Sequence, residues 1–245
     1  MKKIIFWTAL ISILGLLIGA CAKRSAEDAT KGHVESCDDM TASGSITIGS
    51  DTASGTYLLL TGNQFYNSQP ATGCEATTNH YGSPTGTQSV LIKKIITSST
   101  SFVDHESYYS DTTCTSRLGY IEKKFSNLSV GEQVTGLGTP VSGLRPSSGY
   151  RVTYNPDCAK IMGDTDAATA AINTSQAYLF RFNLLTTGTE KVFCLGWACQ
   201  AQTYYDIWGA GDNGTTFSIY QAMGGSAGYE PSDWDDNSGG ATYQK

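Results

Sequence analysis

Short segments in which apolar and polar side chains alternate dominate this chain from residue 42 onward. The clearest is 177–184, where Tyr178, Phe180, Phe182 and Leu184 share one face and two of the three residues between them are polar. A period of two residues is typical of a β-strand with one buried face. The same pattern predicts strands at 45–49, 56–61, 89–97, 101–110, 118–125, 150–154, 190–195 and 215–221.

Turn-forming residues separate these segments. Residues 51–55, 98–100, 186–188 and 212–214 predict turns between strands, and residues 64–86 predict a long loop. Gly and Pro are expected to interrupt the pattern over 131–148. One helix is expected at 164–172, with Asp164 as its N-cap. The fold class is therefore all-β, either an antiparallel barrel or a two-sheet sandwich with one short helix.

The first 21 residues have a different pattern. Two lysines precede an uncharged apolar run over 4–20, which ends on Gly19 and Ala20 directly before Cys21. This arrangement is typical of an export signal. Residues 16–21 resemble the lipobox of bacterial lipoproteins. The resemblance implies that the leader is cut before Cys21 and that this cysteine carries the lipid anchor.

The resemblance also defines the expected organisation of the chain. Residues 1–20 would be the lipoprotein signal peptide, 21–41 a lipidated leash, 42–223 the β domain and 224–245 a flexible acidic tail. Ala22, next to the lipidated cysteine, favours the bacterial outer membrane over the inner membrane in that family, on the periplasmic or the surface side. Two alternatives stay open, namely ordinary signal cleavage with release of the protein and an uncleaved anchor helix.

Six cysteines follow Cys21. They are Cys37, Cys74, Cys114, Cys158, Cys194 and Cys199. An even number in an exported chain indicates disulfide bonds, but their pairing cannot be read from spacing. Only the close pair Cys194 and Cys199 suggests a local bond. No CxxC pair is present, so a zinc site is not expected.

Charge excludes one class of partner. Without the two lysines of the leader, the mature chain has 14 basic and 22 acidic residues, a formal charge of 14 − 22 = −8. Nucleic acid is not an expected partner, because phosphate binding requires a basic face. The expected partner is the lipid bilayer, contacted through acylated Cys21.

No cofactor is expected. Asp233, Asp235 and Asn237 start like a calcium loop, but the pattern then fails, so no metal is expected.

Two short motifs are similar to motifs of lipocalins. Gly55-Thr56-Tyr57 resembles their Gly-x-Trp, with Tyr in the Trp position, and residues 109–114 are similar to a strand-end pattern of lipocalin-like domains. This resemblance implies a β-barrel that holds a small apolar or amphiphilic ligand. Trp197, Tyr204, Tyr205 and Trp208 are the candidates for ligand contact, because aromatic side chains bind with little loss of entropy.

No catalytic residue is predicted. None of the three histidines lies in a nucleophile motif, and alternation places His105 on the face opposite Asp104 and Glu106. The two carboxylates share a face at a spacing that could serve hydrolysis, although a solvated strand surface explains them more simply. Three hypotheses follow: a ligand carrier, a surface adhesion or envelope-interaction module, and, less favoured, a carboxylate-based hydrolase.

Overall fold

The computed structural model describes residues 37–59, 73–76, 83–138, 146–175, 185–194, 202–212, 217–222 and 241–245. Several sequence predictions concern residues outside these ranges. They include the signal peptide with Cys21, residues 21–36 of the leash, the strand at 177–184, Trp197, Cys199, and residues 224–240 of the tail with Asp233, Asp235 and Asn237. Among the described residues, no helix has both the length and the apolar character needed to cross a membrane.

The described chain is built of strands and one helix. The strands are β1 (Ser45–Ile48), β2 (Asp51–Leu59), β3 (Cys74–Ala76), β4 (Ser89–Ile96), β5 (Phe102–Tyr109), β6 (Arg117–Thr135), β7 (Ser148–Gly163), β8 (Lys191–Cys194), β9 (Tyr204–Asp212), β10 (Phe217–Gln221) and β11 (Ala241–Gln244). The helix is α3 (Asp166–Ser175). All strand pairs are antiparallel, which confirms the predicted fold class.

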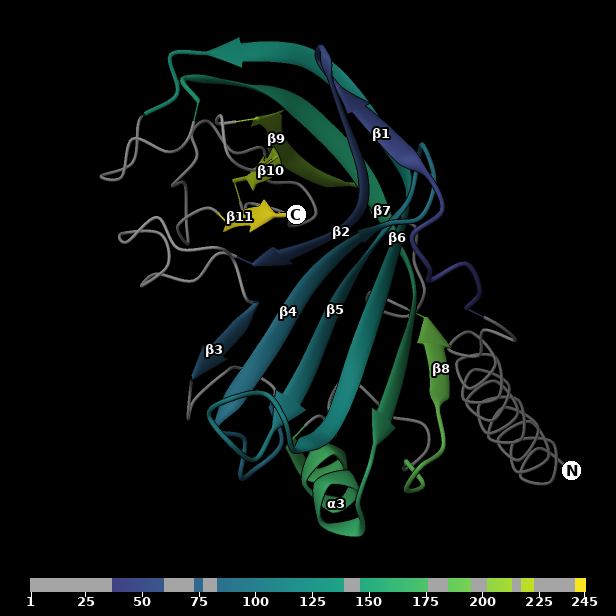
Figure 1. Ribbon diagram of the computed structural model, residues 1–245. Coiled ribbons are helices and arrows are strands. Elements are labelled where there is room, and N and C mark those ends of the chain that lie inside the picture. The colour runs from purple at the N-terminus through teal and green to yellow at the C-terminus, as the bar shows by residue number, and fades with distance from the viewer. Residues whose placement is uncertain are drawn as a thin grey trace, which may run out of the picture.

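The strands form one large, strongly curved sheet (Figure 1). Strand β2 pairs with β11 through Leu58 and Leu59, and with β4 through 55–58. The pairings therefore run from β2 through β11, β10, β9, β7, β6, β5 and β4 and return to β2. Strands β1, β3 and β8 lie outside this circuit.

The two longest strands, β6 and β7, connect two parts of the sheet. Residues 150–154 of β7 pair with β9, whereas residues 158–161 pair with β8. One half of β7 therefore belongs to the circuit, and the other half belongs to an open sheet that β8 flanks on one side and β3 on the other (Figure 1). The helix α3 lies at the end of this open part.

The core lies on one face of the sheet, which we call the inner face. Its main part is an aromatic cluster of Phe102, Phe125, Tyr154 and Trp208, whose rings lie 4.9–6.2 Å apart in their contacts. A second cluster lies toward α3, and we call it the helix-side cluster. Its buried members are Val90, Tyr108, Ile121, Ile161, Ile172 and Leu185. Burial of these side chains is the main favourable term in folding.

Two disulfide bonds join distant parts of the described chain. Cys37 is bonded to Cys158 in β7, with Cα atoms 5.8 Å apart, and Cys74 in β3 is bonded to Cys114, with Cα atoms 6.1 Å apart. The first bond fixes the end of the predicted leash to the outer face of the sheet, where Cys37, Met40, Val103 and Cys158 pack together. Cys194 is also disulfide-bonded. Its bond to Cys199 stays a prediction, because Cys199 lies outside the described residues.

The boundaries of several predicted elements were wrong. The first turn is not 51–55, because Ile48 already pairs with Asp51 and the chain reverses at Gly49, whose φ of 65° suits glycine. Strand β6 continues through Gly131 to Thr135. The helix begins at Asp166, because the side chain of Thr165 caps it by accepting a hydrogen bond from the Ala168 amide at 3.2 Å.

Three strands were not predicted at all. Strand β3 lies within residues 64–86, which were predicted to be a long loop. Strand β9 contains two glycines and a buried Asp206, so its sequence does not show the alternation of apolar and polar residues that is typical of a strand. Strand β11 lies in the segment predicted to be a flexible tail, and for residues 241–244 that prediction was wrong. Ala241 and Tyr243 pack into the core, while the backbone of β11 pairs with β10 and β2.

Candidate functional site

Four charged side chains lie together on the inner face of β4, β5 and β6. Lys94, Asp104 and Lys123 are direct cross-strand neighbours, so their side chains point to the same face. Glu106 lies two residues after Asp104 and shares that face. Lys94 Nζ lies 2.5 Å from Asp104 Oδ1, and Lys123 Nζ lies 2.7 Å from Glu106 Oε1. We call these four residues the charged quartet.

The charged quartet separates the two hydrophobic clusters. On one side of the quartet lie Phe102 in β5 and Phe125 in β6, which belong to the aromatic cluster. On its other side lie Tyr108 in β5 and Ile121 in β6, which belong to the helix-side cluster. The Asp104 and Lys123 side chains are 25% and 32% exposed. Solvent therefore reaches the inner face between the clusters, where it meets both signs of charge.

Lys94 is the buried end of the quartet. Its side chain is fully buried, and its ammonium group lies over the rings of Phe102, Trp208 and Tyr243 at 4.2, 5.0 and 4.9 Å from their centroids. The faces of aromatic rings are electron-rich and attract cations. The rings and the Asp104 carboxylate together compensate the loss of water around this ammonium group.

A third carboxylate, Asp206 in β9, is buried close enough to Lys94 for their charges to interact. It accepts hydrogen bonds from Trp208 Nε1 at 3.0 Å, from Gln221 Nε2 at 2.6 Å and from the Ile207 amide at 2.8 Å. Burial raises the pKa of Asp206 to about 6, although these hydrogen bonds and the positive charge of Lys94 act in the opposite direction. Asp206 therefore changes charge in a mildly acidic range.

Two buried tyrosines complete the polar part of the interior. Burial raises the pKa of Tyr154 and of Tyr243 well above the usual range, and nearby carboxylates raise it further. Tyr154 keeps its proton, and its hydroxyl group donates a hydrogen bond to Asp206 Oδ2 at 3.3 Å. Gln221 Oε1 is buried and accepts no hydrogen bond within the described part of the chain.

The predicted ligand-contact residues fall into different environments. Trp208 is fully buried in the aromatic cluster, and its role as a ligand contact stays a prediction. Tyr204 lies on the inner face and packs against that cluster, 5.7 Å from Tyr154 between ring centroids. Tyr205 points to the opposite face because it is the next residue in the strand. Trp197 lies outside the described residues.

The structure corrects the environment predicted for Asp104 and Glu106. Both lie on the inner face in ion pairs rather than on a solvated strand surface. His105 lies on the other face, as alternation predicted. It contacts Glu122 and Ser107 there, and the sequence analysis singled out neither residue.

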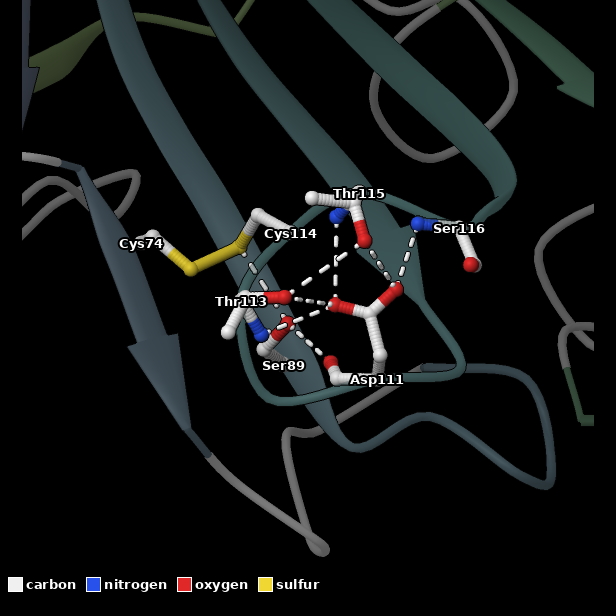
Figure 2. The surroundings of a disulfide bond; sticks show 7 residues. All are labelled: Cys74, Ser89, Asp111, Thr113, Cys114, Thr115 and Ser116. Carbon is white, nitrogen blue, oxygen red and sulfur yellow. Dashed lines mark hydrogen bonds between the residues drawn. A yellow bond between two sulfur atoms is a disulfide. The ribbon is translucent and has the colours of Figure 1, made fainter.

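The loop between β5 and β6 is held by one carboxylate (Figure 2). Asp111 accepts hydrogen bonds from the amides of Thr113, Thr115 and Ser116 and from the hydroxyl groups of both threonines. Desolvation alone would raise the pKa of Asp111, but these hydrogen bonds hold the pKa well below its usual range. Cys114 in this loop forms the bond to Cys74, so carboxylate and disulfide fix the same turn (Figure 2).

Neither metal chemistry nor similarity to known proteins identifies the site. Within the described ranges, no three His, Cys, Asp or Glu side chains are arranged to hold a metal ion. No family model matches the chain, and no curated protein matches it either. The function has to be inferred from the chemistry of the charged quartet and its surroundings.

Proposed function

We propose that this protein is a lipid-anchored lipoprotein of the bacterial cell envelope whose β domain binds a small amphiphilic molecule at the charged quartet. The anchoring part rests on residues 16–21, which resemble a lipobox. The two disulfide bonds support export, because disulfides persist mainly in oxidising compartments.

The charged quartet is the observation that carries the binding role. Charged side chains are rarely placed on the buried face of a sheet, because each loses water there. Here two lysines and two carboxylates lie between two apolar clusters, and Asp104 and Lys123 stay partly exposed. A ligand with a polar group and an apolar part can pair with these charges and cover apolar surface at the same time.

An amphiphilic ligand fits this inner face better than an entirely apolar one. The four rings of the aromatic cluster contact one another. Aromatic side chains therefore fill the inner side of the circuit where this cluster lies. The solvent-reached part of the inner face includes charged side chains, because Asp104 and Lys123 are 25% and 32% exposed. The adhesion hypothesis gains little support, because the aromatic side chains of the described core point inward.

Native mass spectrometry of the protein extracted from membranes in mild detergent tests the binding role. We expect a co-purified small molecule with the wild-type protein and with Lys124→Ala, and its loss with Lys123→Ala. These two lysines are sequence neighbours on opposite faces of β6, so the second variant is a matched control. Equal ligand content in all three proteins would exclude the quartet as the binding site.

Intact mass of the same extracted protein, with and without reduction, tests the anchoring. We expect a chain that starts at Cys21 and carries acyl groups, with a mass increase on reduction of about two hydrogens per disulfide. An unacylated chain that starts elsewhere would overturn the assignment to the lipoproteins.

A further inference from the structure

Ser107, His105 and Glu122 form a continuous hydrogen-bonded chain on the outer face of β5 and β6. Ser107 Oγ lies 2.7 Å from His105 Nε2, and His105 Nδ1 lies 2.9 Å from Glu122 Oε1. His105 and Ser107 share a face because they are two residues apart, and Glu122 is the direct cross-strand neighbour of His105. The geometry follows from the register of two regular strands.

This order of groups fixes the proton positions. Glu122 is an acceptor, so the proton on His105 is held at Nδ1, which leaves Nε2 free to accept the proton of the Ser107 hydroxyl. A hydroxyl within reach of a base that a third group orients is the arrangement of serine nucleophiles, and it is recognised by geometry rather than by motif. The sequence showed no nucleophile motif because the residues come from two strands.

The surroundings hold the chain in place. The His105 ring stacks on Tyr120, with ring centroids 5.8 Å apart and an interplanar angle of 11°. Tyr120 donates a hydrogen bond to Glu190, which anchors the stacking partner. The side chains of His105 and Glu122 are 13% and 18% exposed, and Ser107 is 2% exposed. Low exposure strengthens the hydrogen bonds and restricts access to small groups.

We propose that Ser107 is a nucleophile that His105 activates and Glu122 orients, and that it reacts with small carboxylic esters. Ser107 Oγ bonds to the ester carbonyl carbon while its proton moves to His105 Nε2. The bond between the carbonyl carbon and the alcohol oxygen then breaks, and the alcohol leaves with the proton that His105 Nε2 had accepted. Water attacks acyl-Ser107 in the same way, releases the acid and restores the serine hydroxyl.

Positive charge on the same face favours this reaction. Lys93 is the cross-strand neighbour of His105 on β4, and Lys160 is the cross-strand neighbour of Glu122 on β7. The carbonyl oxygen becomes negative when serine attacks, and cationic groups nearby stabilise such charge. Neither lysine belongs to the charged quartet, so this inference is independent of the proposed binding role.

The test uses the full mature protein in its oxidised form with diisopropyl fluorophosphate, a small reagent that phosphorylates activated serines. We expect one adduct per chain by intact mass, mapped to Ser107 by peptide analysis. Ser107→Ala should lose the adduct, and His105→Gln should slow its formation by about a hundredfold or more. Ser129→Ala, at an exposed serine of β6, should label at the wild-type rate.

The variant Glu122→Gln tests whether Glu122 acts by orienting His105 rather than by stabilising the fold. With p-nitrophenyl acetate as substrate, we expect this variant to lower kcat with little change in KM and an unchanged unfolding midpoint, because Gln keeps the shape but loses the charge. No adduct on wild-type Ser107 would overturn the proposal, even if Ser107→Ala failed to fold. Labelling of Ser107 at the same rate in His105→Gln would also overturn it.

Discussion

The ion pair between Lys94 and Asp104 joins two residues of very different exposure. Lys94 is fully buried, whereas the Asp104 side chain is 25% exposed. If one partner is removed, the other charge is left alone, and the penalty depends on whether water can reach it. The two single substitutions should therefore differ in their effect on stability.

We expect Asp104→Leu to lower the free energy of unfolding by about 3–5 kcal/mol, because it leaves the Lys94 ammonium group buried and without its carboxylate. Lys94→Met should cost only about 1–3 kcal/mol, since water can reach the remaining Asp104 carboxylate. The double variant should cost less than the sum of the two. Urea unfolding at pH 7 measures all three, and strict additivity would contradict the proposed coupling.

Asp206 predicts how stability depends on pH. Its pKa is about 6 in the folded protein against an ordinary value of 3.8, so between these values the folded state binds more protons than the unfolded state. The free energy of unfolding then falls as pH rises through this range, by about 3 kcal/mol in total.

Asp206→Asn should remove this contribution. We expect the stability difference, wild type minus variant, to decrease from pH 4 to pH 7 and then stay constant. Asp157→Asn, at an exposed aspartate of β7, controls for the loss of one carboxylate. A constant difference across the range would show that Asp206 is not the titrating group.

At the scale of the element, the β5–β6 loop shows how one side chain can organise a turn. Cys114 adopts a φ of 54°, which is uncommon for a residue other than glycine. The hydrogen bonds to Asp111 on both sides of Cys114 hold this conformation and keep its sulfur positioned for Cys74. The loop should therefore loosen when the carboxylate is removed.

We expect Asp111→Ala to increase amide exchange at Thr113, Thr115 and Ser116 by about tenfold or more, because three amides lose a charged acceptor. Reduction of the Cys74–Cys114 bond by dithiothreitol should become faster as well. Asp111→Asn should be intermediate, since its amide keeps one acceptor oxygen. Exchange rates measured by mass spectrometry would contradict this prediction if all three proteins behaved alike.

The elements differ in how far the sequence alone could predict them. Strands β4 and β5 were predicted almost to the residue, because their alternation is regular and both faces are packed. Strands β6 and β7 were predicted too short. Their ladder contains shifts of register, and one lies beside Pro156, which pairs with Phe125. A bulge admits a proline that the alternation rule treats as a break.

The candidate sites show the same limit. Alternation placed Asp104 and Glu106 on one face and His105 on the other. The partners Lys94, Lys123 and Glu122 come from neighbouring strands, so the contacts depend on strand order and register. Neither can be read from a single sequence, because hairpin turns of similar composition allow several registers.

At the scale of the whole molecule, the two disulfides close loops of different length. The sequence separation is 121 residues for Cys37–Cys158 and 40 residues for Cys74–Cys114. A crosslink restricts the unfolded chain more when its loop is longer. The first bond also holds the end of the predicted leash against the sheet.

We expect the double substitution Cys37→Ala/Cys158→Ala to lower the free energy of unfolding by about 5 kcal/mol and Cys74→Ala/Cys114→Ala by about 4 kcal/mol. Urea unfolding of the oxidised proteins checks both values. A larger loss from the shorter loop would mean that local contacts, rather than chain entropy, dominate the stabilisation.

The place of β11 has a consequence for how the sheet is completed during folding. Residues 241–244 lie between β10 and β2, so the circuit joins a strand made early to one made almost 200 residues later. Until residues 241–244 are in place, β2 and β10 each present an unsatisfied backbone edge to the surroundings. Folding intermediates in which β11 is not yet paired should therefore be prone to associate through these edges.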